Sequence, residues 1–378
     1  MIIAIVAILS VLGIFGMTFL FPLLAAIISP STKRAAVSSP HPRNVAILIP
    51  AHNEETVIQK TLESIAEAIK VATDTSPCAF RVLVGADGCT DTTAATATKM
   101  GAEVLTMPRK TGKWSTISTL VASCQESQWI VLADCGAAWP KDFLARLLPL
   151  LTREETMGIA PTYLNDASGL VERLVWRTER AIKMIESKCG GPVSVHGATV
   201  CYRTKELTST LQFLSNHHWL NDDIVIPLCL RALYPAKKLE YATHLTVNDS
   251  AAIKSPASRE FVRRRRLVLG NIQWIRHLWV PIWRQNYVAA ILASRRVFRL
   301  LWGYWAISTA STFALYIEVF NLPKPQLLAL ALLITALFSC VKQLRTLLES
   351  GLASILAPYY LLVAILRSST SPYVTQWN

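Results

Sequence analysis

Hydrophobic and polar positions follow two different periods in the first part of the chain's middle region. The run Val45 to Ile49 is continuously apolar, which is typical of a strand buried on both faces, and Pro50 ends it. Apolar residues then recur every three or four positions, which predicts an amphipathic helix over Glu55 to Lys70. The apolar positions of this helix are Ile58, Leu62, Ile65 and Ile69.

The same exchange of strand and helix patterns continues to about residue 133. The predicted strands are Phe80 to Ala86, Glu103 to Leu105 and Trp129 to Ala133, and the predicted helices are Thr92 to Met100 and Trp114 to Ser123. Strands that alternate with helices favour a Rossmann-like α/β fold, with a mostly parallel sheet and crossover helices. Ligands bind such sheets beyond the carboxyl ends of the strands, where Pro50, Asp87 and Asp134 fall.

Long apolar stretches at both ends of the chain predict membrane spans. Ile2 to Ile28 carries no charge, and about 27 helical residues exceed the roughly 20 needed to cross a bilayer. Three further stretches bring the predicted number of spans to four: Leu300 to Phe320, Gln326 to Val341 and Leu352 to Leu366. Two alternatives stay open, a cleaved signal peptide at the start and a re-entrant hairpin over 326–366.

Basic residues beside these stretches predict the orientation of the chain. Lys33 and Arg34 follow the first span, and Lys342 and Arg345 separate the third from the fourth. By the positive-inside rule, the middle of the chain is cytosolic in an integral, multi-pass membrane protein. The predicted parts are a first span at 1–30, a linker at 31–43, an α/β domain at 44–253, an interfacial region at 254–299 and about three spans at 300–367.

The net charge of +13 changes this picture only in one segment. Residues 254–299 carry eleven Lys and Arg against one acidic residue, Glu260, and tryptophans are interleaved with them. This pattern predicts an amphipathic helix on an anionic membrane surface and argues against nucleic acid as a partner. The eight cysteines include no C-x-x-C pair, so we expect free thiols rather than disulfides or a zinc ribbon.

Polar residues with possible chemistry follow the first two predicted strands. After the first strand come Pro50, Ala51 and the polar residues that end in Glu54, which suit contacts to a base or ribose. The alternative is a simple turn into a helix, with acidic residues at its N-terminus. After the second strand, Asp87 suits hydrogen bonds to a uracil ring or a ribose hydroxyl.

A cation and three carboxylates follow further along the chain. Lys113 starts a predicted helix, where a diphosphate is favoured, although Met107 and Trp114 exclude a P-loop. Asp134 ends a strand, where a carboxylate can bind a divalent cation. Asp222 and Asp223 are adjacent, so one of them suits a general base, the alternative being a doubled helix N-cap.

Taken in this order, these residues resemble family 2 glycosyltransferases of the GT-A fold, especially membrane-bound polysaccharide synthases and ceramide glucosyltransferase-like members. The resemblance runs from about Val45 to Trp274. It implies that a nucleotide-sugar donor is contacted by residues at the ends of the first, second and fourth predicted strands and at the start of the third predicted helix. It also implies that Asp134 binds Mg²⁺ or Mn²⁺ and that Asp223 is the catalytic base. Asp222 is the alternative residue for the role of base. The implied donor contacts are Pro50, Ala51, Glu54, Asp87, Lys113 and Asp134.

Two further segments are similar to the acceptor side of this family. The implied acceptor-side residues are His196, Gly197, Arg263, Arg266, Gln273 and Trp274, and Tyr202 and Arg203 belong to the same similarity. Gln273 and Trp274 are adjacent, so the family's Q-x-x-R-W pattern is not intact. The family's D-x-D metal motif reads Asp134, Cys135, Gly136 in this chain and lacks one carboxylate.

The resemblance implies an inverting glycosyltransferase that moves a sugar, for which UDP-sugars are the expected donors, and forms a β-glycosidic bond. The expected acceptor is a lipid, a lipid-linked sugar or a growing polysaccharide at the membrane. The alternative is a catalytically silent GT-A-like membrane subunit that binds a nucleotide or a partner protein. No transfer from any donor is expected in that case.

Overall fold

The computed structural model describes residues 40–164, 170–249 and 257–298, and the isolated residues 27, 311 and 356. Apart from those isolated residues, the spans predicted at 1–30 and 300–367 lie outside the described segments and stay predictions. Of the helices in the described segments, none combines the length and apolar character that a bilayer crossing requires.

The first half of the domain has the predicted alternation of strands and helices. The elements are β1 (Asn44–Ala51), α3 (Ile58–Thr73), β2 (Ala79–Asp87), α4 (Thr93–Lys99), β3 (Glu103–Met107), α5 (Lys113–Ala122) and β4 (Trp129–Ala133). Helix α3 begins later than the predicted Glu55. The carbonyl oxygen of Glu54 accepts hydrogen bonds from the N–H groups of Val57 at 3.0 Å and Ile58 at 2.9 Å, so residues 54–57 form a turn before the helix.

In the second half of the domain, the sequence predicted a helix within residues 254–299, where α10 lies, but not the other elements. The elements of this half are β5 (Ala137–Ala138), α6 (Phe143–Leu147), the 3₁₀ helix η2 (Leu148–Thr152), β6 (Thr156–Leu164), α7 (Leu170–Lys188), β7 (Thr199–Arg203), α8 (Thr204–Phe213), α9 (Asp222–Leu233), β8 (Lys238–Asp249) and α10 (Ala257–Gln285). A further helix covers 287–298.

One sheet holds all eight strands, in the order β3-β2-β1-β4-β7-β6-β8-β5. The four strands from β3 to β4 are parallel, as predicted, whereas β7 runs antiparallel to both β4 and β6. Because of this reversal, the carboxyl end of β4 and the amino end of β7 share one edge, with Ala133 opposite Thr199. The segment that enters β7 therefore meets Asp134, and the backbone N–H of Asp134 donates to the carbonyl of Ala198 at 2.9 Å.

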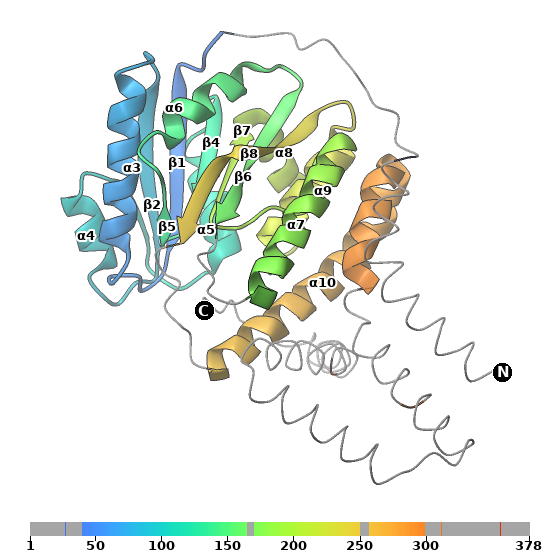
Figure 1. Cartoon of the computed structure of the whole chain (residues 1–378). Helices are drawn as coiled ribbons and strands as arrows, with labels where there is room; N and C mark the ends of the chain where they lie inside the picture. The colour runs from blue at the N-terminus through green and yellow to red at the C-terminus, as the bar shows by residue number, and fades with distance from the viewer. Residues whose placement is uncertain are drawn as a thin grey trace, which may run out of the picture.

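The core lies on both faces of this sheet, and β1 contributes to each. Val45, Ile47 and Ile49 face a cluster that includes buried residues of α3 and α6, whereas Ala46 and Leu48 face a cluster with α5, α9 and α10. All five side chains are at most 1% exposed, which confirms the prediction of a strand buried on both faces. In Figure 1, α3 lies at the left of the sheet and α10 lies below it.

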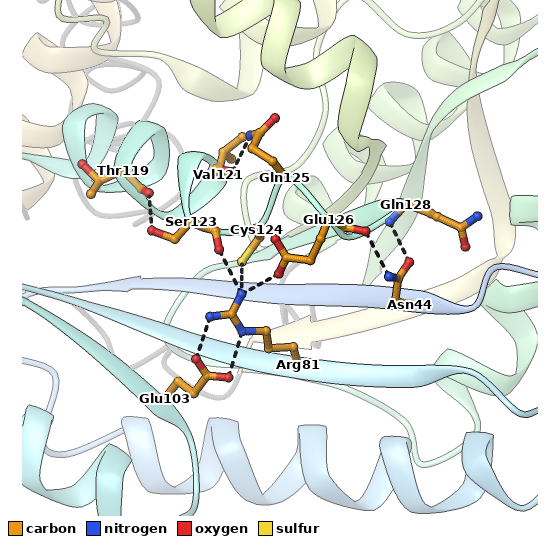
Figure 2. Close-up of polar contacts among 10 residues, drawn as sticks. All are labelled: Asn44, Arg81, Glu103, Thr119, Val121, Ser123, Cys124, Gln125, Glu126 and Gln128. Carbon is orange, nitrogen blue, oxygen red and sulfur yellow. Dashed lines mark hydrogen bonds and ion pairs between the residues drawn. The ribbon is translucent and has the colours of Figure 1, made fainter.

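A charged network ties together the amino ends of the strands, at the opposite edge from Asp134. Figure 2 shows the Arg81 guanidinium, which donates to both carboxylate oxygens of Glu103 at 2.8 Å and to Glu126 at 2.7 Å. Arg81 also donates to the carbonyl of Ser123 at 2.9 Å, and the Asn44 amide donates to the carbonyl of Glu126 at 3.0 Å. These bonds fix β1, β2, β3 and the loop before β4 relative to one another.

Helix α10 buries one face against the domain and exposes another. Trp274 is fully buried and Leu278 and Ile282 are nearly so, whereas Val280 and Trp283 are about half exposed. The expectation that Trp274 faces an anionic membrane is therefore wrong, because its ring packs into the core cluster that contains α5 and α9 residues. Burial of one apolar stripe of a helix in the domain is the usual source of helix stability in a protein.

The cysteines agree with the expectation from the sequence. Seven of the eight lie in the described segments, and all seven are free thiols. Five of the seven are buried, and burial raises the pKa of the Cys78 thiol to about 11, so these thiols are packing groups.

Candidate functional site

The loops after β1 and β2 are joined beyond the carboxyl ends of these strands. The side-chain carbonyl of Asn53 accepts a hydrogen bond from the N–H of Thr90 at 2.8 Å, and the N–H of Glu54 donates to the hydroxyl of Thr93 at 2.8 Å. Asn53 adopts φ of 55°, in the left-handed region that asparagine tolerates better than most residues. Glu54 thus stands on a connected rim, next to which Pro50 and Ala51 are the buried last residues of β1.

Asp87 organises the loop that leads into α5. Its fully buried carboxylate accepts hydrogen bonds from the N–H of Thr111 at 2.6 Å, the Thr111 hydroxyl at 2.9 Å and the N–H of Gly112 at 2.6 Å. Gly112 has φ of 94°, a conformation that glycine adopts without steric cost. These contacts place Lys113, the first residue of α5, at the sheet edge. The predicted contact between Asp87 and a donor base or ribose stays a prediction.

Lys113 lies between two carboxylates that are far apart in the sequence. Its ammonium nitrogen is 2.8 Å from Oδ1 of Asp134, after β4, and 3.1 Å from Oδ2 of Asp222, at the start of α9. The side chains of Lys113, Asp134 and Asp222 are 25%, 40% and 18% exposed, so the triad is partly screened from water. Burial alone lowers the pKa of the Lys113 ammonium, but Asp134 and Asp222 together raise it above its usual value. Lys113 is therefore a fixed cation.

Asp222 and Asp223 occupy different environments although they are neighbours. The alternative of a doubled N-cap is wrong for Asp222, because Asn221 is the N-cap of α9 and the Asp222 carboxylate pairs with Lys113. Burial, followed by the charge of Asp222, raises the pKa of the Asp223 carboxyl above its usual value. The backbone of Asp223 is held in place, since its carbonyl accepts a hydrogen bond from the N–H of Val195 at 2.9 Å.

Two cations near Asp223 were not predicted from the sequence. Arg296 and Lys183 each interact electrostatically with Asp223. Arg296 was included in the basic segment 254–299 and assigned to the membrane, but its guanidinium donates a hydrogen bond to the Ser194 hydroxyl. Lys183 lies on α7, and the spacing of basic residues along that helix gave no sign of which one faces the site.

Of the predicted acceptor-side residues, Gly197 lies directly beside Asp134, and His196 precedes it. A Cβ built on Gly197 would lie 3.2 Å from Oδ2 of Asp134, so the backbone of this segment closely approaches the carboxylate. The His196 ring stacks on Tyr163, with centroids 3.6 Å apart and planes 7° apart. Arg203 is placed elsewhere: it lies opposite Trp129, at the amino end of β4, because β7 runs antiparallel.

The predicted α10 residues bear on the site in different ways. Gln273 accepts a hydrogen bond from the N–H of Leu220 at 3.2 Å and donates to the carbonyl of His218 at 2.7 Å, so it fixes the loop directly before Asp222. Trp274 has no exposed surface, because its ring packs in the core, and it does not line the surface of the site. Arg266 is partly exposed and interacts electrostatically with Asp134 and Asp223. The Arg263 side chain lies outside the described part of the chain.

A divalent cation would find one carboxylate ligand in the segment directly after β4. Asp134 is followed by Cys135 and Gly136, and no cluster of three His, Cys, Asp or Glu side chains able to hold a metal occurs within the described segments. A metal cage built from protein side chains alone therefore does not fit. Mg²⁺ is often bound through one or two carboxylates together with substrate phosphates, and the partly exposed Asp134 fits such a shared site.

Solved structures share the fold of this chain. A mannosyltransferase, PcManGT from Pyrobaculum calidifontis, solved with GDP-Man and Mn²⁺, matches with a TM-score of 0.70 and 18% identity, over 95% of this chain and 99% of that one. Glucosyl-3-phosphoglycerate synthase from Mycobacterium tuberculosis, with Mn²⁺, UDP and glucosyl-3-phosphoglycerate, has a TM-score of 0.42 and 23% identity, over 67% and 80%. At these identities the first match shows the fold alone. No curated protein matches the sequence.

The match to a sequence family covers the part of the chain that builds this site. The family described as glycosyltransferase-like family 2 matches residues 42–267, which run from just before β1 into α10 and include the Lys113, Asp134 and Asp222 triad. The mixed α/β sheet and the sugar-transferase structural match agree with this assignment. The chain belongs to glycosyltransferase family 2.

Proposed function

We propose that this chain is an inverting glycosyltransferase that moves a sugar from a nucleotide diphosphate donor to an acceptor hydroxyl at the membrane surface. The observation that carries the proposal is the placement of Lys113 between Asp134 and Asp222, with Asp223 next along α9. A fixed cation beside a strand-end carboxylate suits a diphosphate leaving group, and a neighbouring carboxylate suits a base.

On the donor side, the rim at Glu54, with Pro50 and Ala51 next to it, holds the base and ribose, and Asp87 holds the loop that presents Lys113. The ammonium of Lys113, held between Asp134 and Asp222, contacts the diphosphate of the bound donor. A UDP-sugar is the expected donor, and GDP-sugars are the nearest competitors because the mannosyltransferase of similar fold was solved with GDP-Man.

On the acceptor side, Asp223 acts as the general base. The hydroxyl oxygen forms a bond to the anomeric carbon while the bond from that carbon to the diphosphate oxygen breaks, and the hydroxyl proton passes to the Asp223 carboxylate. Attack from the face opposite the leaving group inverts the configuration, so an α-linked donor gives a β-linked product. A pKa raised by burial and by Asp222 makes Asp223 a stronger base than an exposed aspartate.

A divalent cation, Mg²⁺ or Mn²⁺, would be held by Asp134 and the donor phosphates, where it would offset the charge on the departing diphosphate. Asp134→Asn removes this ligand, so nucleotide affinity in that variant should no longer rise when Mn²⁺ is added. Lys113 neutralises part of the same charge without a metal.

The acceptor is a lipid, a lipid-linked sugar or a growing polysaccharide, and the domain faces the cytosol between its predicted spans. The incomplete D-x-D motif at Asp134 favours one second candidate, a silent GT-A-like membrane subunit that binds a nucleotide or a partner. The two candidates differ in whether any sugar is transferred.

Incorporation of radiolabelled sugar tests the proposal directly. Membranes that contain the full chain are incubated with a panel of UDP- and GDP-sugars and Mn²⁺, and the products are extracted into organic and aqueous phases. We expect label from one donor in one phase, and none with Asp223→Asn membranes. Absence of label from every donor, with nucleotide binding intact, would support the silent subunit.

A further inference from the structure

A second cavity, which the proposed mechanism does not use, lies behind the His196 segment. It measures about 180 Å³ and lies between the end of β6, α7 and β8. The residues that matter for its chemistry are Tyr163, Trp176, Arg177, Arg180, Lys183 and Tyr241. A cavity of this size is smaller than a typical site for a whole cofactor and fits one chemical group of a larger molecule.

The cavity lining is positively charged. Arg177 and Arg180 are exposed cations, and Lys183 is a partly buried one. Glu179 is the acidic residue among the described lining residues, and its carboxylate oxygens are each 3.2 Å from the guanidinium of Arg295. Because Arg295 offsets the charge of Glu179, the lining of the cavity keeps an excess of positive charge, although Glu186 and Asp223 also act on Lys183.

Aromatic rings form the other wall. The Tyr163 ring stacks on His196, and the Trp176 ring lies 5.2 Å from Tyr163 and 5.8 Å from His196. The ammonium of Lys183 is 5.9 Å from the centre of the Tyr241 ring. Rings beside cations suit an anionic group that is attached to an apolar or ring-shaped neighbour.

The cavity adjoins the acceptor side of the candidate active site. His196, at its aromatic wall, precedes Gly197, which closely approaches the Asp134 carboxylate. Lys183, in its basic wall, interacts electrostatically with Asp223. A molecule bound in the cavity would therefore reach toward the proposed base without occupying the donor rim at Glu54.

We propose that this cavity binds a phosphate group of the acceptor, so that the sugar is transferred to a phosphorylated molecule. The inference rests on the proposed function, because it places the acceptor beside Asp223. The guanidinium group of one arginine can donate two parallel hydrogen bonds to two oxygens of a phosphate. The ammonium of Lys183 adds a compact positive charge. The phosphate belongs either to a lipid headgroup or to a soluble sugar phosphate, which share this chemistry.

Binding of phosphate esters to the full-length protein in detergent tests the inference. Phenyl phosphate is titrated calorimetrically in the presence of saturating UDP or GDP, so that the donor site contributes no signal, and phenyl sulfate serves as the singly charged comparison. The lipid source is tested by flotation with phosphatidylcholine vesicles that do or do not contain phosphatidic acid. We expect binding of the phosphate ester, the phosphatidic acid vesicles or both, and weaker binding of the sulfate.

The variants Arg180→Gln and Lys183→Gln should weaken this binding by about tenfold or more each, because each removes a charge-assisted hydrogen bond. Arg177→Gln, at an exposed position that the fold tolerates, keeps the test valid if Lys183→Gln fails to fold. The matched control is Arg146→Gln, an exposed arginine on α6 that is paired with Asp142. Nucleotide affinity should be unchanged in all four variants.

Phosphate binding that is equal in the four variants, or equal for phosphate and sulfate, would overturn the inference, as would an absence of binding to both probes. Loss of UDP and GDP binding with phosphate binding intact would instead contradict the proposed function. The two failures are therefore distinguishable.

Discussion

Asp223 and Asp222 give the sharpest prediction at the scale of single residues. Asp223→Asn keeps the size of the side chain but cannot accept a proton at neutral pH, so transfer should fall by about 10² to 10⁴. Donor affinity should change little, because the donor contacts lie on other strand ends. Asp222→Asn should retain turnover, since its carboxylate is already paired with Lys113.

Single-turnover transfer and nucleotide binding, measured side by side, separate these effects. Asp142→Asn, at a half-exposed carboxylate that pairs with Arg146, is the matched control. An inactive Asp222→Asn enzyme together with a normal Asp223→Asn enzyme would move the base by one residue.

The pH dependence of transfer should reveal the coupling between these two carboxyl groups. Burial first, and then the charge of Asp222, raise the pKa of Asp223 above 3.8, and only its ionised form acts as a base. The rate should therefore fall on the acid side at a pH above the ordinary aspartate range. In Asp222→Asn one cause of the raised pKa is gone, so this acid limb should move to lower pH. A limb that stays in place in the kcat profile would contradict the coupling.

At the scale of helices and strands, Gln273 connects α10 to the catalytic loop. Its amide makes two hydrogen bonds to the backbone of Leu220 and His218, just before Asp222. Gln273→Ala should lower kcat by roughly tenfold with little change in donor KM, because Asp222 and Asp223 lose a fixed position. It should also cost about 1 to 3 kcal/mol of unfolding free energy. The matched control is Gln285→Ala, an exposed residue at the end of the same helix.

A loss of stability without any fall in kcat would limit Gln273 to a packing role. Recovery of kcat in Gln273→Asn would also argue against a positioning role for Gln273. The shorter asparagine side chain cannot reach both backbone groups, so it should not restore the position of the loop. Thermal unfolding and steady-state kinetics on the same preparations decide between these outcomes.

The sequence predicted those elements whose burial is uniform along the chain. Val45 to Ile49 and Trp129 to Ala133 are apolar throughout because both faces of these strands are covered, so their pattern is local and readable. Strand β7 is almost as buried, but its antiparallel pairing with β4 depends on distant residues. That pairing decides that His196 lies near Asp134 while Arg203 lies at the opposite edge.

The residues of the candidate site divide in the same way, into those that a local pattern reveals and those whose position depends on distant parts of the chain. Asp134 and Asp223 could be found because each directly adjoins an apolar run, and their order along the chain resembles a known family. The bridging position of Lys113 was not predictable, because it depends on the angle at which α9 meets the sheet. Lys183 and Arg296 were missed for a similar reason, since only the packing of α7 and the helix at 287–298 turns them toward Asp223.

At the scale of the whole molecule, the basic segment 254–299 has two roles. Some of its residues are predicted to contact the membrane, and others lie at the candidate active site. The sequence predicts that Arg263 to Arg266 lie against an anionic membrane. The structure adds that Arg266 interacts with the Asp134 and Asp223 carboxyl groups, opposing the rise in their pKa values that burial causes. One turn of α10 therefore combines a residue at the candidate site with residues assigned to the membrane.

The two roles should separate in variants that remove charge in parts. The double variant Arg263→Gln/Arg264→Gln should lose activity in vesicles that contain anionic lipid and keep it in neutral detergent. Each basic residue near an anionic surface contributes about 1 kcal/mol, so vesicle binding should weaken by roughly tenfold or more. Arg266→Gln should lose activity in both settings, because the carboxylates at the site lose a compensating charge. Vesicle flotation and transfer assays on the same variants test this division, and an equal loss for the double variant in neutral detergent would assign those arginines to the donor or acceptor instead.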